Sequence, residues 1–146
     1  MENKDYQGVI LVDNSLTAAF ESIASGVNEW WVTNIEGSSQ NPGDVFTLHF
    51  SGEVFLTFKV TEFVRDQKIE WTVIDCYLPW LQDKKEWNDT RVLFEFEKKG
   101  DQVQITMTHI GLRPEIECFD SCVKGWDQYF KGSLHKLLSE GVGQPN

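Results

Sequence analysis

The sequence feature that most constrains the fold is one long amphipathic segment near the C-terminal end, ECFDSCVKGWDQYFKGSLHKLL. Its apolar residues recur at steps of three and four, which places their side chains on one side of an α-helix. They are Phe119, Cys122, Trp126, Phe130, Leu134 and Leu137. No other segment has a helical pattern of this length, so we expect this helix to cover the apolar face of the remaining structure.

Two glycines lie beside that apolar face, Gly125 and Gly132. Each should weaken a helix by about 1 kcal/mol relative to alanine. Their position seven residues apart puts them in one stripe along the helix. Two explanations remain open: the helix backbone approaches another element closely, or the missing side chains leave room for a ligand.

The middle of the chain alternates apolar and polar residues with a period of two, which predicts strands. Turn-forming sequences such as RDQK and KKGDQ separate these strands by hairpin-length connections, so we expect them to be antiparallel. The inward positions of the predicted sheet are Phe46, Leu48, Phe50, Val54, Leu56, Phe58, Val60, Ile69, Trp71, Val73, Val92, Phe94, Phe96, Val103, Ile105 and Met107.

The predicted fold is α+β, with a helix gripped by a sheet. A first strand over Val9–Asp13 leads to a helix capped by Asn14 or Ser15, and Gly26 divides this segment into two short helices. A curved antiparallel sheet of about six to seven strands then wraps around the long C-terminal helix, which ends at Gly141. The 146 residues suit one domain spanning 1–146.

Charge and composition exclude several partners. The chain carries 23 acidic and 13 basic residues, a formal net charge of −10, and no basic cluster is segregated from the acids. Such a surface repels nucleic acid and anionic membranes. The apolar run Val9–Val12 is too short for a signal peptide, and no segment is long enough to span a membrane, so a cytoplasmic protein is expected.

The three cysteines indicate neither a disulfide framework nor a metal centre. Cys118 and Cys122 are four residues apart, but no second Cys or His pair stands at metal-binding spacing. We therefore expect no cofactor and no metal. The favoured interpretation of the pair is as small packing residues, and a soft-metal or oxidant-responsive pair is the alternative.

Four segments together resemble the SRPBCC superfamily of START-like helix-grip proteins. They are AFESIASGVNEWW, NPGDVFTLHF, DTRVLFEFEKKGDQVQITMTHIGL and GWDQYFKGSLHKLLSEG, and they span nearly the whole chain. Within that superfamily the chain is similar to the branch named after the activator of the ninety-kilodalton heat-shock protein's ATPase. The resemblance implies a cavity between the concave face of the sheet and the C-terminal helix, used to bind apolar molecules or, in a minority of members, to catalyse reactions.

Alternation along two strands predicts a polar cluster at one end of this cavity. Continuing from Met107 brings His109 inward, and continuing from Trp71 brings Asp75 and Tyr77 inward unless a β-bulge shifts the register. These groups could orient a ligand hydroxyl or exchange protons. Alternatively, His109 is satisfied by a local hydrogen bond.

Aromatic residues could form the cavity wall or fill the space themselves. Trp80 and Trp87 flank a loop that we place at the cavity mouth, as a gate or an interaction patch. The predicted ligand-binding residues are Trp71, Asp75, Tyr77, Phe94, Phe96, Met107, His109, Trp126 and Tyr129.

Three functions are compatible with the sequence. The favoured one is a module that binds a small apolar or amphipathic ligand, as a monomer or homodimer. The second is a co-chaperone-like interaction protein, as the name of the branch suggests. The third is a hydrolase, cyclase or isomerase that acts through Asp75, Tyr77 and His109, although the sequence contains no GxSxG, HExxH or phosphate-binding glycine motif.

Overall fold

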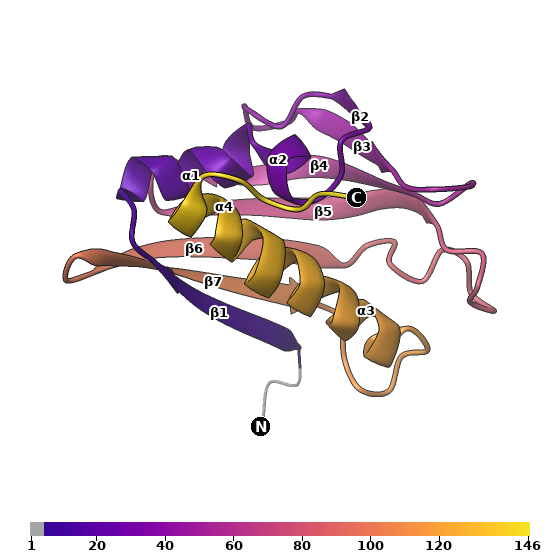
Figure 1. The fold of residues 1–146 in the computed structure, drawn as a ribbon. Coiled ribbons are helices and arrows are strands. Elements are labelled where there is room, and N and C mark those ends of the chain that lie inside the picture. The colour runs from indigo at the N-terminus through magenta and orange to yellow at the C-terminus, as the bar shows by residue number, and fades with distance from the viewer. Residues whose placement is uncertain (1–4) are drawn as a thin grey trace.

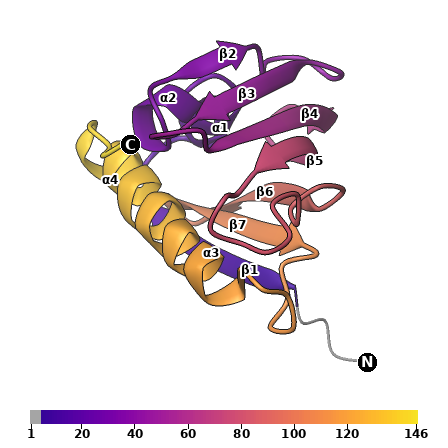
Figure 2. The ribbon, with the colours of Figure 1, turned by 90° about the vertical axis from the view of Figure 1, so that its right-hand side faces the viewer.

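The computed structural model describes residues 5–146 and confirms the helix-grip fold. Seven antiparallel strands form one curved sheet in the order β1-β7-β6-β5-β4-β3-β2, and the helices lie on its concave face (Figures 1 and 2). The strands are β1 (Tyr6–Val12), β2 (Ile35–Gly37), β3 (Val45–His49), β4 (Phe55–Val64), β5 (Lys68–Tyr77), β6 (Arg91–Lys99) and β7 (Gln102–Ile110).

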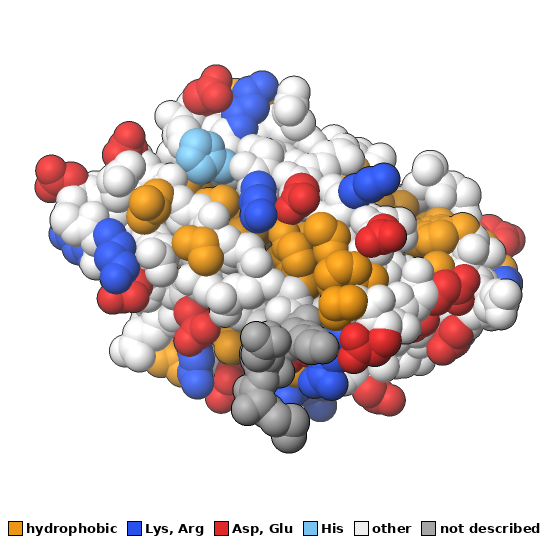
Figure 3. All heavy atoms as spheres, turned by 90° about the horizontal axis from the view of Figure 1, so that it is seen from below, with side chains coloured by type: hydrophobic (Ala, Val, Ile, Leu, Met, Phe, Trp, Pro, Cys, Tyr) orange, Lys and Arg blue, Asp and Glu red, His pale blue; other side chains and the backbone are white. Residues whose placement is uncertain are grey.

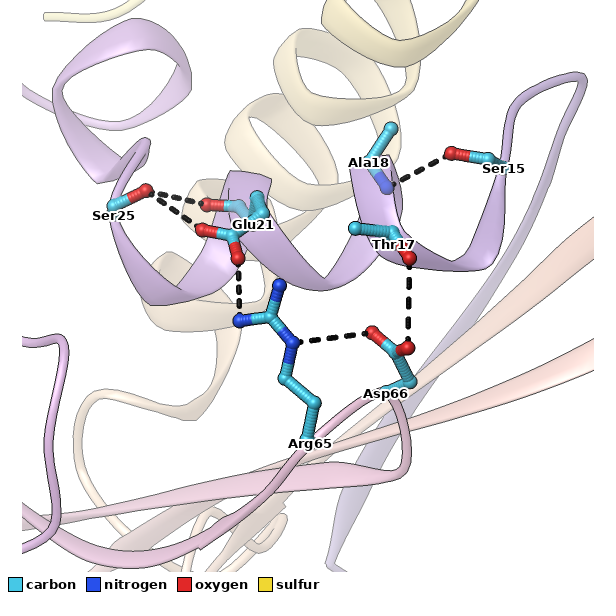
Figure 4. Close-up of polar contacts among 7 residues, drawn as sticks. All are labelled: Ser15, Thr17, Ala18, Glu21, Ser25, Arg65 and Asp66. Carbon is cyan, nitrogen blue, oxygen red and sulfur yellow. Dashed lines mark hydrogen bonds and ion pairs between the residues drawn. The ribbon is translucent and has the colours of Figure 1, made fainter.

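The two short helices after β1 form where the capping signals predict them. The Ser15 side chain accepts a hydrogen bond from the Ala18 amide and begins α1 (Leu16–Ala24), and Gly26 separates it from α2 (Val27–Trp30). The guanidinium of Arg65, in the turn between β4 and β5, binds the carboxylates of Glu21 and Asp66 and so ties α1 to the sheet (Figure 4).

The C-terminal helix is continuous but not uniform. It comprises α3 (Phe119–Trp126), a stretch of wider π-helical turns called η1 (Asp127–Leu134), and α4 (His135–Glu140). Gly141 adopts a left-handed conformation with φ of 87° and ends it, as predicted. Among the described residues no helix has the length and apolar character that crossing a membrane requires.

The helix packs tightly against the sheet at a strand glycine. A Cβ placed on Gly8 of β1 would lie 3.3 Å from Cδ2 of Phe130. On the helix itself, a Cβ on Gly132 would make only an ordinary contact, 3.5 Å from the Asp127 carbonyl oxygen, and one on Gly125 would meet nothing within 4 Å. Close packing therefore explains neither helix glycine.

A β-bulge in β5 reverses the side chains that follow it. Val73 pairs with Phe58 of β4, and Asp75 pairs with the preceding Thr57, so Ile74 is one residue too many. Trp71 and Val73 face the core before the bulge, while Cys76 and Leu78 face it afterwards. A single inserted residue has this effect because side chains alternate with a period of two.

The strand β1 forms one edge of the sheet, and two of its outward side chains, Val9 and Leu11, are apolar. Val9 is 48% exposed and Leu11 is 44% exposed. Figure 3 looks onto the side of the molecule that carries this edge, where hydrophobic side chains gather among scattered acidic and basic ones. The many acidic side chains on this side agree with the net charge of −10.

Candidate ligand pocket

A pocket of about 170 Å³ opens at the end of the molecule where the C-terminal helix begins. Its helix wall consists of Ser121, Cys122, Gly125, Trp126 and Tyr129. The facing walls come from the loop after β5, with Leu78, Trp80 and Trp87, and from the hairpin between β3 and β4, with Phe50, Val54 and Leu56. Trp31, which follows α2, completes the lining. Nearly every wall is aromatic or aliphatic.

The helix wall leaves space because Gly125 has no side chain. A Cβ at this position would have no neighbour within 4 Å, and Gly125 itself lines the pocket. Of the two explanations for the helix glycines, Gly125 fits the second: its missing side chain leaves room beside the helix.

A buried histidine fixes two pocket tryptophans without reaching the pocket itself. The Trp126 indole donates a hydrogen bond to Nδ1 of His109 over 3.1 Å, so the ring proton of His109 lies on Nε2. Nε2 then donates to the Thr90 hydroxyl over 2.9 Å, and Thr90 donates to the Trp87 carbonyl oxygen over 2.6 Å. This series of hydrogen bonds connects the helix wall of the pocket to the loop wall.

Burial keeps the His109 ring neutral. His109 is 0% exposed, and desolvation lowers its pKa from 6.5 to about 3. A neutral ring can accept from Trp126 at Nδ1 and donate to Thr90 at Nε2 at the same time, whereas a protonated ring could not accept. His109 is therefore a positioning residue that is locally satisfied.

Two glutamates fasten the loop wall to the start of the helix by reciprocal hydrogen bonds. The Glu86 carboxylate accepts from the backbone amides of Glu117 over 3.1 Å and of Cys118 over 2.9 Å. In return, the Glu117 carboxylate accepts from the backbone amide of Gln82 over 2.9 Å. Each carboxylate satisfies amides that have no partner within their own segment, so the loop and the helix start hold each other in place.

Four residues singled out in the sequence line this pocket: Trp80, Trp87, Trp126 and Tyr129. Trp80 is 55% exposed, whereas Trp87 is only 6% exposed and belongs to the wall. Five other predicted residues lie elsewhere. Trp71, Phe94, Met107 and His109 are 0% exposed and Phe96 is 8% exposed, and all five fill the core instead of lining the pocket.

Alternation predicts that Asp75 and Tyr77 face inward unless a β-bulge intervenes, and the bulge at Ile74 is that exception: it turns both to the outer face of the sheet. There the Asp75 carboxylate accepts a hydrogen bond from Lys85 Nζ over 2.7 Å, and this bond lowers the pKa of Asp75. Asp75, Tyr77 and His109 therefore do not converge, and the structure gives no support to acid-base chemistry through them.

Several lining residues have no signal in the sequence that marks them as part of a pocket. Phe50 and Val54 were assigned to strands, but they flank the turn between β3 and β4 and extend over the pocket. Leu78 points inward only because of the bulge. Among residues 5–146 no group of three or more His, Cys, Asp or Glu side chains is placed to hold a metal ion.

A family model described as "Activator of Hsp90 ATPase homolog 1-like protein" matches residues 15–139. The match includes α1, the strands β2 to β7 and nearly all of the C-terminal helix. No curated protein matches the sequence.

Solved structures share the fold at low sequence identity. The solution structure of the Aha1 dimer from Colwellia psychrerythraea has a TM-score of 0.80 and 21% identity, covering 95% of this chain and 98% of that chain. Protein MLL2253 from Mesorhizobium loti has a TM-score of 0.68 and 16% identity over 86% and 92% of the two chains. DynU16, from the dynemicin biosynthetic locus, has a TM-score of 0.72 and 12% identity, covering 97% of this chain and 49% of that chain.

Proposed function

The chain belongs to the family of Activator of Hsp90 ATPase homolog 1-like proteins, and on that premise we propose that it binds a small, flat, apolar molecule in the pocket between α3 and the loop after β5. The observation that carries the proposal is the pocket itself, because it is apolar, open and bordered by Gly125 on its helix wall. A core that packed to completion would leave no such space.

The volume of the pocket limits the ligand. An apolar cavity of about 150 Å³ in another protein stays dry and takes up benzene. A pocket of about 170 Å³ therefore suits one aromatic ring or a short alkyl group, with any larger remainder at the mouth beside Trp80. Trp31, Trp87 and Trp126 supply indole faces and edges against which a ring can pack.

Chemistry at the walls also favours an uncharged ligand. Among residues 5–146 no Lys, Arg, Asp or Glu side chain lines the pocket, so a charged group would lose its hydration without gaining a partner there. The polar groups that do line it belong to Ser121, Cys122 and Tyr129, and they can orient one weakly polar substituent.

The test uses toluene as the probe and heteronuclear NMR of the full chain as the readout. We expect toluene to shift the indole N–H signals of Trp87 and Trp126 in a saturable way and to leave that of Trp30, which donates to the Ser22 carbonyl oxygen in the core, nearly unchanged.

The matched variants are Gly125→Leu, which fills the pocket from the helix, and Gly132→Leu, whose new side chain lies outside the pocket on an exposed part of the same helix. Gly125→Leu should abolish the shifts, and Gly132→Leu should preserve them. Equal responses to toluene in both variants, or no saturable shift in the original chain, would refute a binding role for this pocket.

A second candidate function is protein interaction. The exposure of Trp80, 55% at the pocket mouth, favours it, since large exposed aromatic residues are enriched at contact surfaces. The solved Colwellia psychrerythraea protein is a dimer, and the family description names a chaperone ATPase. Sedimentation velocity of the chain and its Trp80→Ser variant tests self-association, and stimulation of a heat-shock ATPase tests the co-chaperone role. Failure of both removes this candidate.

A further inference from the structure

We propose that Cys118 and Cys122 form a dithiol site that captures a soft, thiophilic centre, a trivalent arsenic or similar metalloid carrying one flat apolar substituent, and that this substituent occupies the adjoining pocket. The proposal rests on the proposed binding function for the position of the substituent. The two thiols themselves are an independent observation.

The two sulfurs accept from the same indole N–H at one wall of the pocket. The Trp87 indole N–H approaches Sγ of Cys118 and Sγ of Cys122 over 3.2 Å each. Cys122 lines the pocket and is 8% exposed, whereas Cys118 is 1% exposed and does not line it. A reagent in the pocket therefore meets the Cys122 sulfur first and the Cys118 sulfur second.

The surroundings favour reaction at Cys122. The hydrogen bond between the two thiols lowers the pKa of Cys122 and raises the pKa of Cys118, because the Cys118 thiol acts as the donor. The Trp87 N–H adds a second donor to the Cys122 sulfur. A thiolate is the nucleophile in such reactions, so the first sulfur bond should form at Cys122 and the second at Cys118.

The composition of the site selects a centre that needs only two protein ligands. Zinc sites usually take four, and among the described residues no third Cys, His, Asp or Glu joins the pair to form such a group. Soft centres prefer sulfur ligands, and an arsenic with an aryl substituent is complete with two sulfurs. The pocket of about 170 Å³ has the size of that aryl ring.

The capture step balances without any oxidant or reductant. Phenylarsine oxide forms two As–S bonds, its oxygen leaves as water with the two thiol protons, and the arsenic stays trivalent. In the product the Trp87 N–H can still donate to both sulfurs, as hydrogen-bond donors around the ligands of metal sites do, and this stabilises the sulfur ligands.

The third cysteine provides a control within the same chain. Cys76 is 0% exposed and does not line the pocket, and burial raises the pKa of its thiol. It should remain unmodified while the pair reacts. If Cys118 and Cys122 serve only as packing residues, all three cysteines should behave alike.

The experiment titrates the full chain with phenylarsine oxide under an excess of a monothiol and follows the adduct by native mass spectrometry. We expect one arsenical per chain in the original protein and in Cys76→Ser. Either Cys118→Ser or Cys122→Ser should bind at least about 100-fold more weakly, since the second bond of a chelate raises affinity by 10² or more. Equal binding by all variants, or no adduct in the original chain, overturns the proposal.

A second measurement does not depend on whether the serine variants fold. Arsenic X-ray absorption of the adduct of the original chain should show two As–S bonds and one As–C bond. One As–S bond would overturn the dithiol assignment.

Inorganic arsenite separates the two proposals, because it can use the thiols without the pocket. Toluene binding without capture of either arsenical overturns the dithiol site and leaves the pocket function standing. Capture of both arsenicals without toluene binding overturns the pocket function and leaves the dithiol site standing. In that case the substituent of the arsenical does not lie in the pocket. Phenylarsine oxide held more tightly than arsenite, with the advantage lost in Gly125→Leu, supports both.

Discussion

His109 illustrates how a single residue can shape a pocket that it does not touch. Strand alternation predicts its inward direction and is compatible with two roles, contact with a ligand and a local hydrogen bond. The structure supports the second role, since both ring nitrogens are hydrogen-bonded, one to Trp126 and the other to Thr90. Asp75 shows the limit of the same reasoning, because alternation cannot reveal where a bulge inserts one residue.

The buried His109 should make stability depend on pH. Its pKa is lowered from 6.5 to about 3 in the folded chain, so above pH 6.5 neither the folded nor the unfolded chain holds the proton. As the pH falls from 6.5 toward about 3, the unfolded chain takes up a proton that the folded chain refuses, and stability should decline by about 1.4 kcal/mol per pH unit.

The measurement is urea denaturation of the original chain and of His109→Gln between about pH 7 and about pH 5, a range above the usual titration of carboxyl groups. The difference in unfolding free energy between the two should shrink as the pH falls, because the variant lacks the titrating group. His135→Gln, which changes a histidine outside the buried network, is the control and should follow the original chain. A constant difference would show that folding does not lower the pKa of His109.

Both glycines of the C-terminal helix should lower its stability, although only Gly125 borders the pocket. Gly125→Ala and Gly132→Ala should each raise the unfolding free energy by about 0.5 to 1 kcal/mol, because neither new methyl group meets an obstacle and alanine favours the helix. Chemical denaturation measures this. A loss of stability in Gly132→Ala alone would mean that the π-helical turns of η1 require glycine.

The elements themselves were largely predictable and their local irregularities were not. The 3.6-residue pattern predicted the C-terminal helix and its end at Gly141, and Ser15 was one of the two residues expected to cap α1. The three-residue strand β2 was missed because so short a segment has no readable period. The first strand was placed at Val9–Asp13 and lies at Tyr6–Val12, since hydrophobicity alone sets no boundary for an edge strand.

For the whole molecule, contacts between segments far apart in the sequence determine where the pocket forms. The sequence carries no direct signal for these contacts. The pocket joins segments near Trp31, Val54, Trp87 and Gly125, and no periodic pattern could reveal that these meet. The family resemblance supplied the expectation of a cavity under the helix. The pocket is small and lies at one end of the helix because of three local features. They are the β-bulge in β5, the hairpin between β3 and β4 that extends over the pocket, and the hydrogen bonds of Glu86 and Glu117.

The C-terminal residues should stabilise the whole fold through α2. The Asn146 amide donates to the Trp31 carbonyl oxygen over 2.7 Å, and the Gln144 amide donates to the Ser133 hydroxyl over 2.7 Å. Removal of residues 143–146 should lower the unfolding free energy by about 1 to 3 kcal/mol, as expected for two or three lost hydrogen bonds.

Thermal and urea denaturation of the shortened chain measure the loss. Val142→Ser keeps these backbone bonds and changes a side chain that is 65% exposed, so it should have the stability of the original chain. Equal stability of the shortened and original chains would show that the docked residues contribute nothing.

The close spacing of five tryptophans should determine how the protein fluoresces. Trp31 lies 4.8 Å from Trp126, 5.5 Å from Trp30 and 6.4 Å from Trp71 between ring centroids, and Trp126 lies 6.2 Å from Trp87. Indoles at such separations exchange excitation energy faster than they emit light, so the five rings should fluoresce as one coupled set. A molecule that quenches one pocket ring should therefore dim the emission of rings buried far behind it, and an unlabelled chain should report occupancy of its own pocket.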